Sequence, residues 1–330
     1  MSLLRLLFLP VVIATATPIA QAATDSPLEL LVAIPLPGVK GRIDHLSVDV
    51  TGHRLFVAAL GNDTLEVIDT EAKAHLRSVQ GFGEPQGVLY LPGSNRLFVA
   101  NGSANRVDIL DASSFAVLGR VAGLDDADNL RYDTAAGKVV VGYGKGALRM
   151  LDPLTGASAG EMALPQHPES FQLEQNGTRV FVNVPRASQI AVLDRRTRSS
   201  VAKWELPGAK ANFPMALDEK GRRLFVGARS PAVMLVYDID TGKVVARKMI
   251  GEDPDDLFFD HERSRIYVIC GTGHVETFRQ ESPDRYTAEG QAMTAPWART
   301  GLFVPEEARL YVAGPAVGRW PAQVFVFRVR

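Results

Sequence analysis

Acidic residues and a histidine recur at equivalent places along this chain, and they are residue types that bind cations or transfer protons. The set is Asp44, His45, Asp128, Glu169, Asp255 and Asp256. Carboxylate oxygens are hard ligands of the kind that Ca²⁺ prefers, whereas a histidine in the set would suit a transition metal better. Carboxylates that converge would also raise one another's pKa unless a cation neutralises them.

Polar and aromatic residues fill the same places elsewhere in the chain. They are Arg42, Gln86, Asn129, His167, Trp297 and Arg299. As a binding site, the combined set would hold a small polar molecule, with tryptophan as a stacking face. As a catalytic site, it would use His45 or His167 as the general base with Glu169 or Asp255 as its partner. Arg299 would then hold a carboxylate or an oxyanion.

A divalent cation is a further interpretation, because several of these residues offer oxygen ligands. The oxygen donors are Asp44, Asp128, Asn129, Glu169 and Asp255. The structural alternative is that Asp and Asn favour turns that lead into strands for backbone reasons, and that these side chains are simply solvated. No sequence motif indicates any other cofactor.

A repeat places all these residues in register. The pentapeptide Arg54–Ala58 returns as Arg96–Ala100, and looser copies recur at intervals of 41 to 44 residues. The later copies begin at Lys138, Arg179, Arg223, Arg265 and Arg309. The candidates stand nine, ten or twelve residues before this basic residue, while the position eight before it is apolar in most copies. A site is expected where the copies disagree, and a scaffold where they agree.

Each unit has the same plan of short alternating runs. The basic run is followed by a loop, by a second run that ends in Asp, as at Val67–Asp69, and by a further run such as Lys243–Ile250. The period of two and the many Val, Phe, Leu and Tyr residues are typical of β-strands. Four strands in each of seven units predict an all-β fold, a seven-bladed β-propeller of four-stranded blades.

The last blade is expected to take one strand from the beginning of the chain. After Val324–Val329 the final unit has no fourth run, while Leu28–Leu36 precedes the first unit without a blade of its own. We expect this N-terminal strand to complete the last blade, which closes the ring and leaves no large exposed sheet edge.

The propeller geometry would bring the candidate residues together. The first strand of each blade lines the central axis, so the segments that lead into all seven first strands meet at one mouth of the channel. Loops between second and third strands surround that mouth and carry basic and aromatic residues. They include Arg186, Arg229, Arg319 and Trp320. A small polar or anionic molecule, or a protein partner, would fit such a mouth.

One unit carries a resemblance to a known repeat. Glu84–Val88 (EPQGV) followed by Arg96–Asn101 (RLFVAN) resembles the YVTN-type repeat of exported bacterial propellers, the YncE-like family. The resemblance implies the propeller fold. Related seven-bladed proteins include lactonase-type enzymes and cofactor-bearing subunits of oxidoreductases, but a fold alone does not determine a function.

Residues 1–22 have the features of a secretory signal peptide. Arg5 precedes the apolar stretch Leu6–Ala16, and Ala20–Ala22 (AQA) has the small-x-small pattern of a cleavage site. The apolar stretch is too short to span a bilayer about 30 Å thick. Residues 23–330 are therefore expected to form one propeller domain, periplasmic or secreted, with no membrane span once the signal is removed.

Composition excludes several classes of function. The 330 residues include 36 basic and 37 acidic ones, a net charge of −1, which does not support a bulk electrostatic grip on nucleic acid or acidic membranes. A single cysteine, Cys270, excludes an intramolecular disulfide and a cysteine-rich zinc site. Gly142–Gly146 resembles a phosphate-binding loop, but a strand rather than a helix is expected to follow it.

The favoured function is an exported propeller that binds a small polar ligand or a protein partner at the channel mouth, without covalent chemistry. Two alternatives remain open. One is a lactonase-type hydrolase acting on a small lactone or carboxylate-bearing substrate. The other is an accessory or cofactor-bearing subunit of a periplasmic oxidoreductase.

Overall fold

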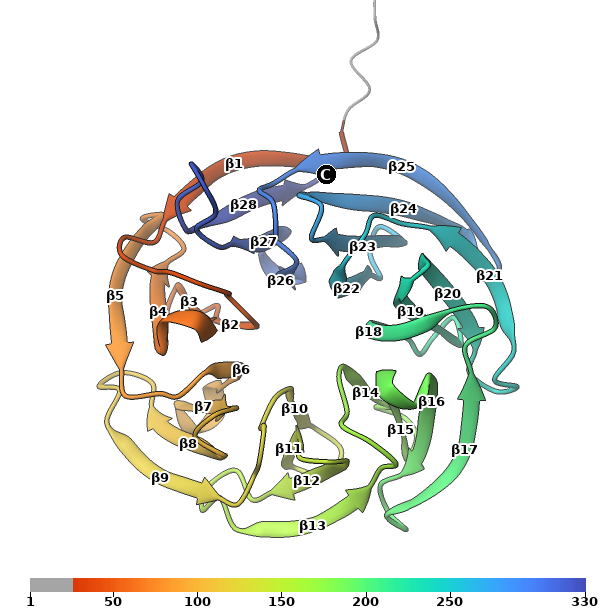
Figure 1. The fold of residues 1–330 in the computed structure, drawn as a ribbon, viewed down its shortest axis with the longest axis horizontal. Coiled ribbons are helices and arrows are strands. Elements are labelled where there is room, and N and C mark those ends of the chain that lie inside the picture. The colour runs from red at the N-terminus through yellow and green to blue at the C-terminus, as the bar shows by residue number, and fades with distance from the viewer. Residues whose placement is uncertain (1–25) are drawn as a thin grey trace, which may run out of the picture.

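Seven four-stranded antiparallel sheets surround a central axis (Figure 1). The computed structural model describes residues 26–330, and the predicted signal peptide, residues 1–22, lies outside them. The prediction of an all-β, seven-bladed propeller with four-stranded blades is confirmed. No helix of the described residues is long and apolar enough to cross a bilayer.

Strands are placed from the axis outward in chain order within six of the blades, and the seventh has β1 outside β26, β27 and β28 (Figure 1). The innermost strands are β2 (Leu46–Asp49), β6 (Pro85–Leu91), β10 (Leu130–Asp133), β14 (Phe171–Leu173), β18 (Lys210–Asp218), β22 (Pro254–Asp260) and β26 (Thr300–Val304). The second strands are β3 (Arg54–Ala59), β7 (Arg96–Asn101), β11 (Lys138–Tyr143), β15 (Arg179–Val184), β19 (Arg223–Ser230), β23 (Arg265–Cys270) and β27 (Arg309–Gly314).

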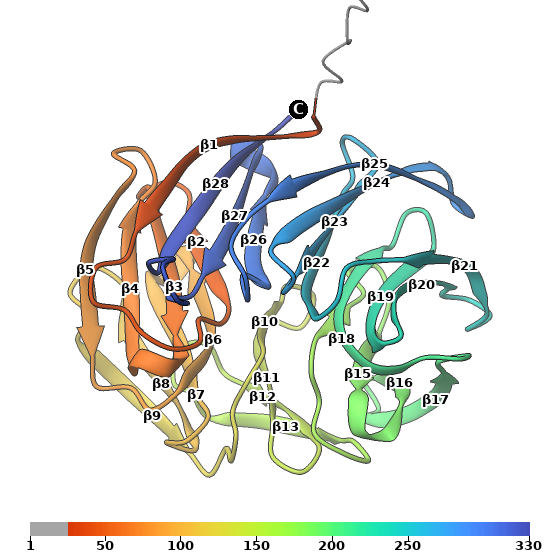
Figure 2. The ribbon, with the colours of Figure 1, turned by 45° about the horizontal axis from the view of Figure 1, so that its top comes forward.

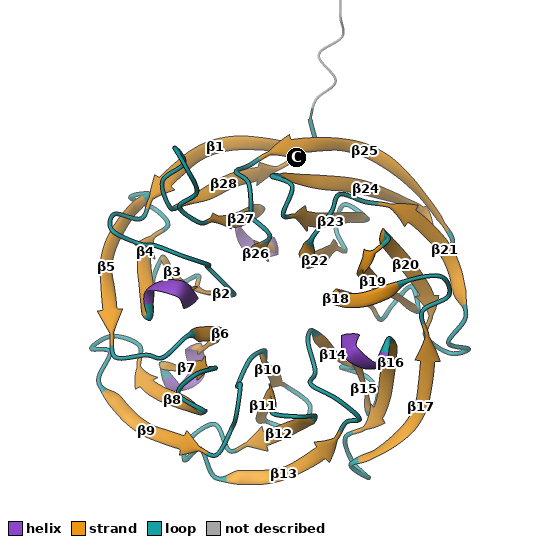
Figure 3. Cartoon of the chain, in the orientation of Figure 1, coloured by secondary structure: helices purple, strands orange, loops and turns teal. Residues whose placement is uncertain are grey.

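The outer half of each blade follows the same order. The third strands are β4 (Thr64–Asp69), β8 (Arg106–Asp111), β12 (Ala147–Leu151), β16 (Gln189–Asp194), β20 (Ala232–Asp238), β24 (His274–Ser282) and β28 (Gln323–Val329). The outermost strands are β5 (Ala74–Gln80), β9 (Val117–Ala122), β13 (Ser158–Ala163), β17 (Ser199–Glu205), β21 (Val244–Met249), β25 (Arg285–Met293) and β1 (Leu28–Pro35). Short 3-10 turns, purple in Figure 3, are η1 (Leu60–Asn62), η2 (Pro92–Ser94), η3 (Pro185–Ala187) and η4 (Pro305–Glu307).

The ring is closed by β1, as the sequence predicted. This strand runs antiparallel to β28, with Leu28 opposite Val329 and Pro35 opposite Gln323. The blade therefore has the order β1-β28-β27-β26 and joins the two ends of the described chain (Figure 2). Because β1 pairs with the outer edge of β28, the last blade is completed by a strand from the start of the described chain.

The core lies between the blades, and the repeated pentapeptide forms it. Leu55, Phe56 and Val57 on β3 are fully buried. Successive side chains of a strand point to opposite faces. Leu55 and Val57 pack in one cluster with Tyr311 of the last blade, whereas Phe56 packs with Val99 of the next blade. Each second strand thus joins two neighbours, which explains why its sequence is the best preserved among the repeats.

The basic residue of the repeat and the acid five positions before it are structural partners. Arg54 Nη2 lies 2.6 Å from Asp49 Oδ2, and Arg54 also donates to the carbonyl of Ala112 in the next blade. The other oxygen of Asp49 accepts the N–H of Gly52 at 2.9 Å and so caps the turn. This pair lies at the end of the ring opposite the start of the innermost strands, away from the candidate site.

Candidate functional site

One cavity at the channel mouth is lined by the same repeat position of all seven blades. This mouth cavity has a volume of about 320 Å³. The position ten residues before the basic residue supplies Asp44, Gln86, Asp128, Glu169, Phe213, Asp255 and Arg299. Each of these residues lies just before or within the first residues of an innermost strand, so the symmetry of the ring turns seven distant segments toward one point.

Most of the candidate residues lie on this cavity. Besides members of that ring, Arg42, His45 and His167 line it. Asn129, Asp256 and Trp297 do not. Asn129 is buried beneath the cavity, Asp256 lines a second cavity deeper in the channel, and Trp297 is exposed on the rim beside Arg42 and Arg299.

Five further residues line the mouth cavity that the sequence did not single out as ring candidates, and one of them is Pro185. Asp126 and Phe213 belong to the same repeat columns, and Arg186 reaches in from η3. Arg229 was expected in a loop, but it lies near the end of the extended strand β19. The signal for Phe213 was its column, which carries polar residues in the other six blades. The two arginines were predicted only as part of an outer basic rim.

Two arginines and two aspartates form an alternating network on one side of the cavity. Arg229 reaches Asp253 at 3.0 Å and Asp255 at 2.6 Å, while Arg299 reaches the second oxygen of each at 2.7 and 2.9 Å. The Arg229 guanidinium also lies 3.5 Å from the ring centroid of Phe213. Burial raises the pKa of Asp255 to about 6 against the opposing effect of both arginines, so its carboxylate is ionised at neutral pH.

His45 forms the floor of the mouth cavity. Its Nδ1 lies 3.5 Å from Asp256 Oδ2, and its Nε2 lies 3.7 Å from Asp44 Oδ1 and 4.0 Å from Asp128 Oδ1. Burial alone would lower the pKa of this imidazole, but the carboxylates of Asp256, Asp44 and Asp128 raise it to about 10. His45 is therefore a buried cation at neutral pH, which suits a structural or binding role better than that of a general base.

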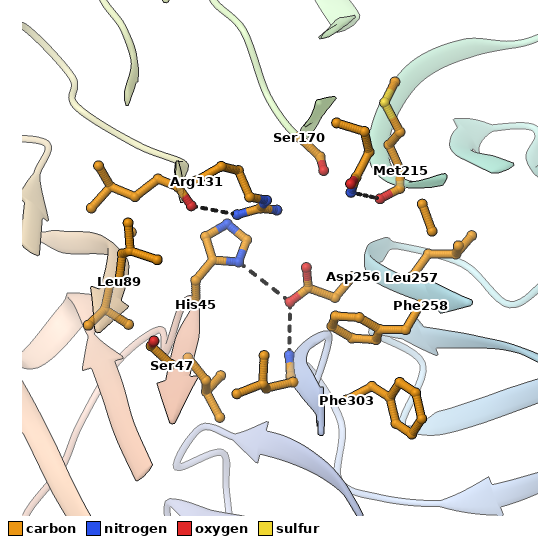
Figure 4. A pocket seen from close by; sticks show the side chains of 18 of the residues that line it. His45, Ser47, Leu89, Arg131, Ser170, Met215, Asp256, Leu257, Phe258 and Phe303 are labelled. Carbon is orange, nitrogen blue, oxygen red and sulfur yellow. Dashed lines mark hydrogen bonds and ion pairs between the residues drawn. The ribbon is translucent and has the colours of Figure 1, made fainter. Parts of the chain in front are cut away.

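A second cavity, of about 330 Å³, lies in the channel on the other side of His45 (Figure 4). Its lining is mainly apolar and includes Leu89, Met215 and Phe258, with Arg131 among them. Asp256 Oδ2 accepts the N–H of Gly301 at 2.9 Å and faces His45 across the boundary. The charged mouth cavity thus ends at the His45–Asp256 pair, below which the channel becomes apolar.

A cluster of Asp128, His167 and Glu169 lies opposite the arginine network. One potential ligand atom from each residue lies within 4.8 Å of the other two. His167 Nδ1 donates to the carbonyl of Gly144 at 2.7 Å, and its Nε2 lies 3.8 Å from Asp128 Oδ2. Burial lowers the pKa of His167, but Asp128 and the Gly144 carbonyl raise it to about 9.

Glu169 is the carboxyl group of the cluster that has the fewest hydrogen-bond and ion-pair partners. Burial and the carboxylates of Asp128 and Asp255 raise its pKa to about 8. Within residues 26–330 its carboxyl group has no hydrogen-bond or ion-pair partner. Asp44 is the contrasting case, because burial opposes its ionisation but His45 and Arg42 hold its pKa below the ordinary value.

The oxygen ligands predicted for a divalent cation do not all face one point. Asp44 is paired with Arg42 at 2.5 Å, and Asp255 is held by two arginines. The side-chain amide of Asn129 is engaged by His45, 3.1 Å from its Nε2. Among the predicted five, Asp128 and Glu169 are the pair that the structure brings together, and the histidine beside them is His167.

Comparison with known proteins supports the fold. No protein-family model matches the chain, and no curated protein matches it either. Many chains of known structure do match. One is a chain of the structure described as "Crystal Structure of Mitotic Checkpoint Complex", 14% identical, with a TM-score of 0.76 over 97% of this chain and 98% of its own length. At that identity the likeness shows a common propeller fold and nothing about what either mouth binds.

Proposed function

We propose that this chain is an exported propeller of the YVTN-repeat type whose mouth cavity binds a small polar ligand without covalent chemistry. The family assignment rests on the repeat of Glu84–Val88 and Arg96–Asn101, and export rests on residues 1–22. The binding role rests on the cavity itself. Its volume, about 320 Å³, is within the range of small-molecule sites.

The observation that carries the proposal is the presence of two uncompensated groups on one cavity. Arg186 and Glu169 both line it, and among residues 26–330 neither side-chain head group has a hydrogen-bond or ion-pair partner. The other ring arginines are already paired with aspartates. A small ligand with an anionic group for Arg186 and a cationic or hydrogen-bond-donating group for Glu169 would satisfy both, and a free amino acid has this combination.

The hydrolase alternative is less well supported by the histidines. A general base must be unprotonated, and a carboxylate that orients it should lie within hydrogen-bond distance, about 3.2 Å. His45 and His167 have pKa values raised to about 10 and about 9, and their nearest carboxylate oxygens lie 3.5 and 3.8 Å away. These features favour charge compensation over proton transfer. No feature of residues 26–330 favours the oxidoreductase alternative over binding.

Thermal unfolding with the twenty amino acids, citrate and inorganic phosphate as probes tests the binding function. At least one probe is expected to raise the melting temperature of the wild type in a concentration-dependent way. Glu169→Gln and Arg186→Gln should weaken that response. Matched controls are Glu306→Gln and Arg196→Gln, which are exposed residues on the opposite end of the ring. A probe response that is the same in all five proteins, or no response at all, would contradict the proposal.

Export has its own test. The full chain, expressed in a Gram-negative host, should be recovered in the periplasmic fraction or the medium with Ala23 as its first residue. Recovery of intact Met1 protein in the cytoplasm would contradict export, and it would leave the binding role of the cavity unaffected.

A further inference from the structure

We propose that Asp128, His167 and Glu169 form a site for a divalent transition-metal cation inside the mouth cavity. This inference rests on the binding function proposed for that cavity and names the chemical class of its ligand. It differs from the all-oxygen site expected from the sequence, because it includes an imidazole and excludes Asp44 and Asp255.

The three side chains are spaced as ligands of one ion. Asp128 leads into β10, and His167 and Glu169 lead into β14 of the neighbouring blade. One ligand atom from each lies within 4.8 Å of the others. The 3.8 Å between His167 Nε2 and Asp128 Oδ2 is too long for a hydrogen bond. Two tetrahedral ligands with bonds of about 2.1 Å lie about 3.4 Å apart, so a small side-chain movement suffices.

The backbone holds two of these residues in place. The N–H of Asp128 donates to Gly142 O at 3.0 Å, and the N–H of Glu169 donates to Asn183 O at 3.0 Å. Both acceptors lie on the second strands of their own blades. The ligands therefore stand on the rigid part of the ring, which a preformed metal site requires.

The orientation of His167 is a second, independent observation. Its Nδ1 donates to the carbonyl of Gly144 at 2.7 Å, which leaves Nε2 directed toward Asp128. Histidine ligands of metals almost always donate their other ring N–H in this way, which fixes the tautomer and the ring plane. The cation would occupy the place of the proton that Nε2 otherwise carries.

Charge compensation around the cavity leaves this corner open for a cation. Arg42 is engaged by Asp44, while Arg229 and Arg299 are engaged by Asp253 and Asp255. No described arginine or lysine forms an ion pair with Asp128 or Glu169, and the charged neighbours of Asp128 are His45 at 4.0 Å and His167 at 3.8 Å. A divalent cation would compensate both carboxylates and relieve the repulsion between them.

The donor set indicates the class of metal. Two carboxylates with one imidazole suit Mn²⁺, Fe²⁺, Co²⁺ or Zn²⁺ better than Ca²⁺, which takes six to eight oxygens. Three protein ligands leave at least one coordination position for water or for a ligand atom. Because the trio lines the cavity, that position faces the space where the polar ligand is proposed to bind.

A second group of possible ligands on the β23–β24 hairpin is the main competitor. Cys270, His274 and Glu276 also have ligand atoms within 4.8 Å of one another. The Cys270 thiol is fully buried, whereas Asp128, His167 and Glu169 all line the mouth cavity and are open to an entering ion. The mouth group contains no thiol, so the two groups differ in a way that spectroscopy can separate.

Cobalt titration of metal-free protein distinguishes the two sites. After dialysis against EDTA, the wild type is expected to bind one Co²⁺ with visible d–d bands and no thiolate-to-cobalt charge-transfer band. His167→Gln, Glu169→Gln and Asp128→Asn should each weaken Co²⁺ and Zn²⁺ binding by about tenfold or more, and circular dichroism would show that each variant is folded. Cys270→Ser and His274→Gln are the matched controls and should bind as the wild type does.

Two results would overturn the metal site. One is a charge-transfer band that disappears in Cys270→Ser, which places the ion on the hairpin. The other is that the wild type and the folded variants of the trio bind Co²⁺ and Zn²⁺ equally well. A wild type that binds neither ion counts as this result too. If the amino-acid or anion probes still distinguish Glu169→Gln from Glu306→Gln in either case, the metal site fails while the binding function stands.

Discussion

Arg299 and Asp255 occupy the same repeat position in neighbouring blades, and they form an ion pair in which Arg299 Nε lies 2.9 Å from Asp255 Oδ2. Asp255 receives a second arginine, Arg229, at 2.6 Å on its other oxygen. One repeat position thus carries opposite charges in neighbouring blades, and these charges pair at the mouth. The divergence consequently has a structural component, and not every polar residue at the mouth is free to bind a ligand.

Replacing one arginine of this network should destabilise the protein. Arg229→Met leaves Asp255 with one partner, and loss of one member of a buried ion pair costs about 3 kcal/mol of the free energy of unfolding. The cost should be smaller at pH 5 than at pH 8, because the pKa of Asp255 is raised to about 6 and its carboxyl is then largely protonated. Urea unfolding at the two pH values measures both effects. An equal loss at both would show that Asp255 is not the group left uncompensated.

The fold followed from the sequence because every blade must bury the same positions. Leu55, Phe56 and Val57 together contact both neighbouring blades. Because every blade packs in this way, the same residue types recur in each unit, and the recurrence indicates a ring of equivalent blades. Strand β1 was identifiable because the last unit lacked a fourth run. The Asp49–Arg54 pair also recurs, but its role in capping a turn and linking to Ala112 required coordinates.

Strand β1 should contribute as much to stability as an outermost strand that follows the rest of its blade in the sequence, such as β13. Ile34 of β1 and Met162 of β13 are both buried, 1% and 0% exposed, whereas Leu30 of β1 is 50% exposed. Ile34→Ala and Met162→Ala should each lower the free energy of unfolding by about 2–4 kcal/mol. Leu30→Ala should stay within about 0.5 kcal/mol. Denaturant unfolding checks all three, and a small effect at Ile34 alone would mean that β1 detaches before the ring unfolds.

Turn aspartates should make the protein sensitive to strong acid. Asp152 accepts the N–H groups of Leu154 and Thr155 at 3.0 Å each, and these bonds lower its pKa to about 2. A lowered pKa contributes stability that is present above about pH 4 and is lost as the pH falls toward 2. Asp152→Asn should therefore flatten the fall of the melting temperature between pH 5 and pH 2.

The control for this acid sensitivity is an exposed aspartate without such bonds. The Asp125 carboxylate accepts no hydrogen bond from residues 26–330, so Asp125→Asn should leave the pH profile of the melting temperature unchanged. Asp194 has the same kind of turn, and bonds from Thr178 and Thr197 lower its pKa to about 2. A steeper profile in Asp152→Asn than in the wild type would contradict the assignment.

The location of the candidate site could be predicted from the sequence, but which of its carboxylates are paired with arginines could not. The repeat columns placed Asp44, Asp128, Glu169 and Asp255 at one mouth. Which of them remain uncompensated depends on side chains from other segments. Arg229 stands in β19 yet pairs with Asp255 of the next blade, a relationship without a sequence signal.

His45 and Asp256 should be energetically coupled as the floor of the mouth cavity. His45→Leu removes the cation between three buried carboxylates and is expected to cost about 3 kcal/mol. Asp256→Asn in that background should restore part of the loss, because it removes the facing charge, 3.5 Å away, while its side-chain oxygen still accepts the Gly301 N–H. A double-mutant cycle by urea unfolding should give a coupling of about 1–2 kcal/mol. Additive effects would show that His45 is held by other groups.

Replacing Arg131 should affect the free energy of unfolding differently from replacing Arg229, although both arginines line cavities of the channel. Arg131 lines the apolar channel cavity, where it donates to Leu130 O at 2.9 Å and lies 5.7 Å from the ring centroid of Phe171. Burial lowers its pKa, and no described carboxylate forms an ion pair with it. Exchange of such a charge for an apolar side chain of similar volume is often neutral or stabilising. Arg131→Met should therefore lower the free energy of unfolding by less than about 1 kcal/mol, or raise it. In the same urea series, Arg229→Met should lower it by about 3 kcal/mol. A comparable loss in both variants would show that attraction between Arg131 and Asp256 across the channel outweighs the cost of burying the guanidinium.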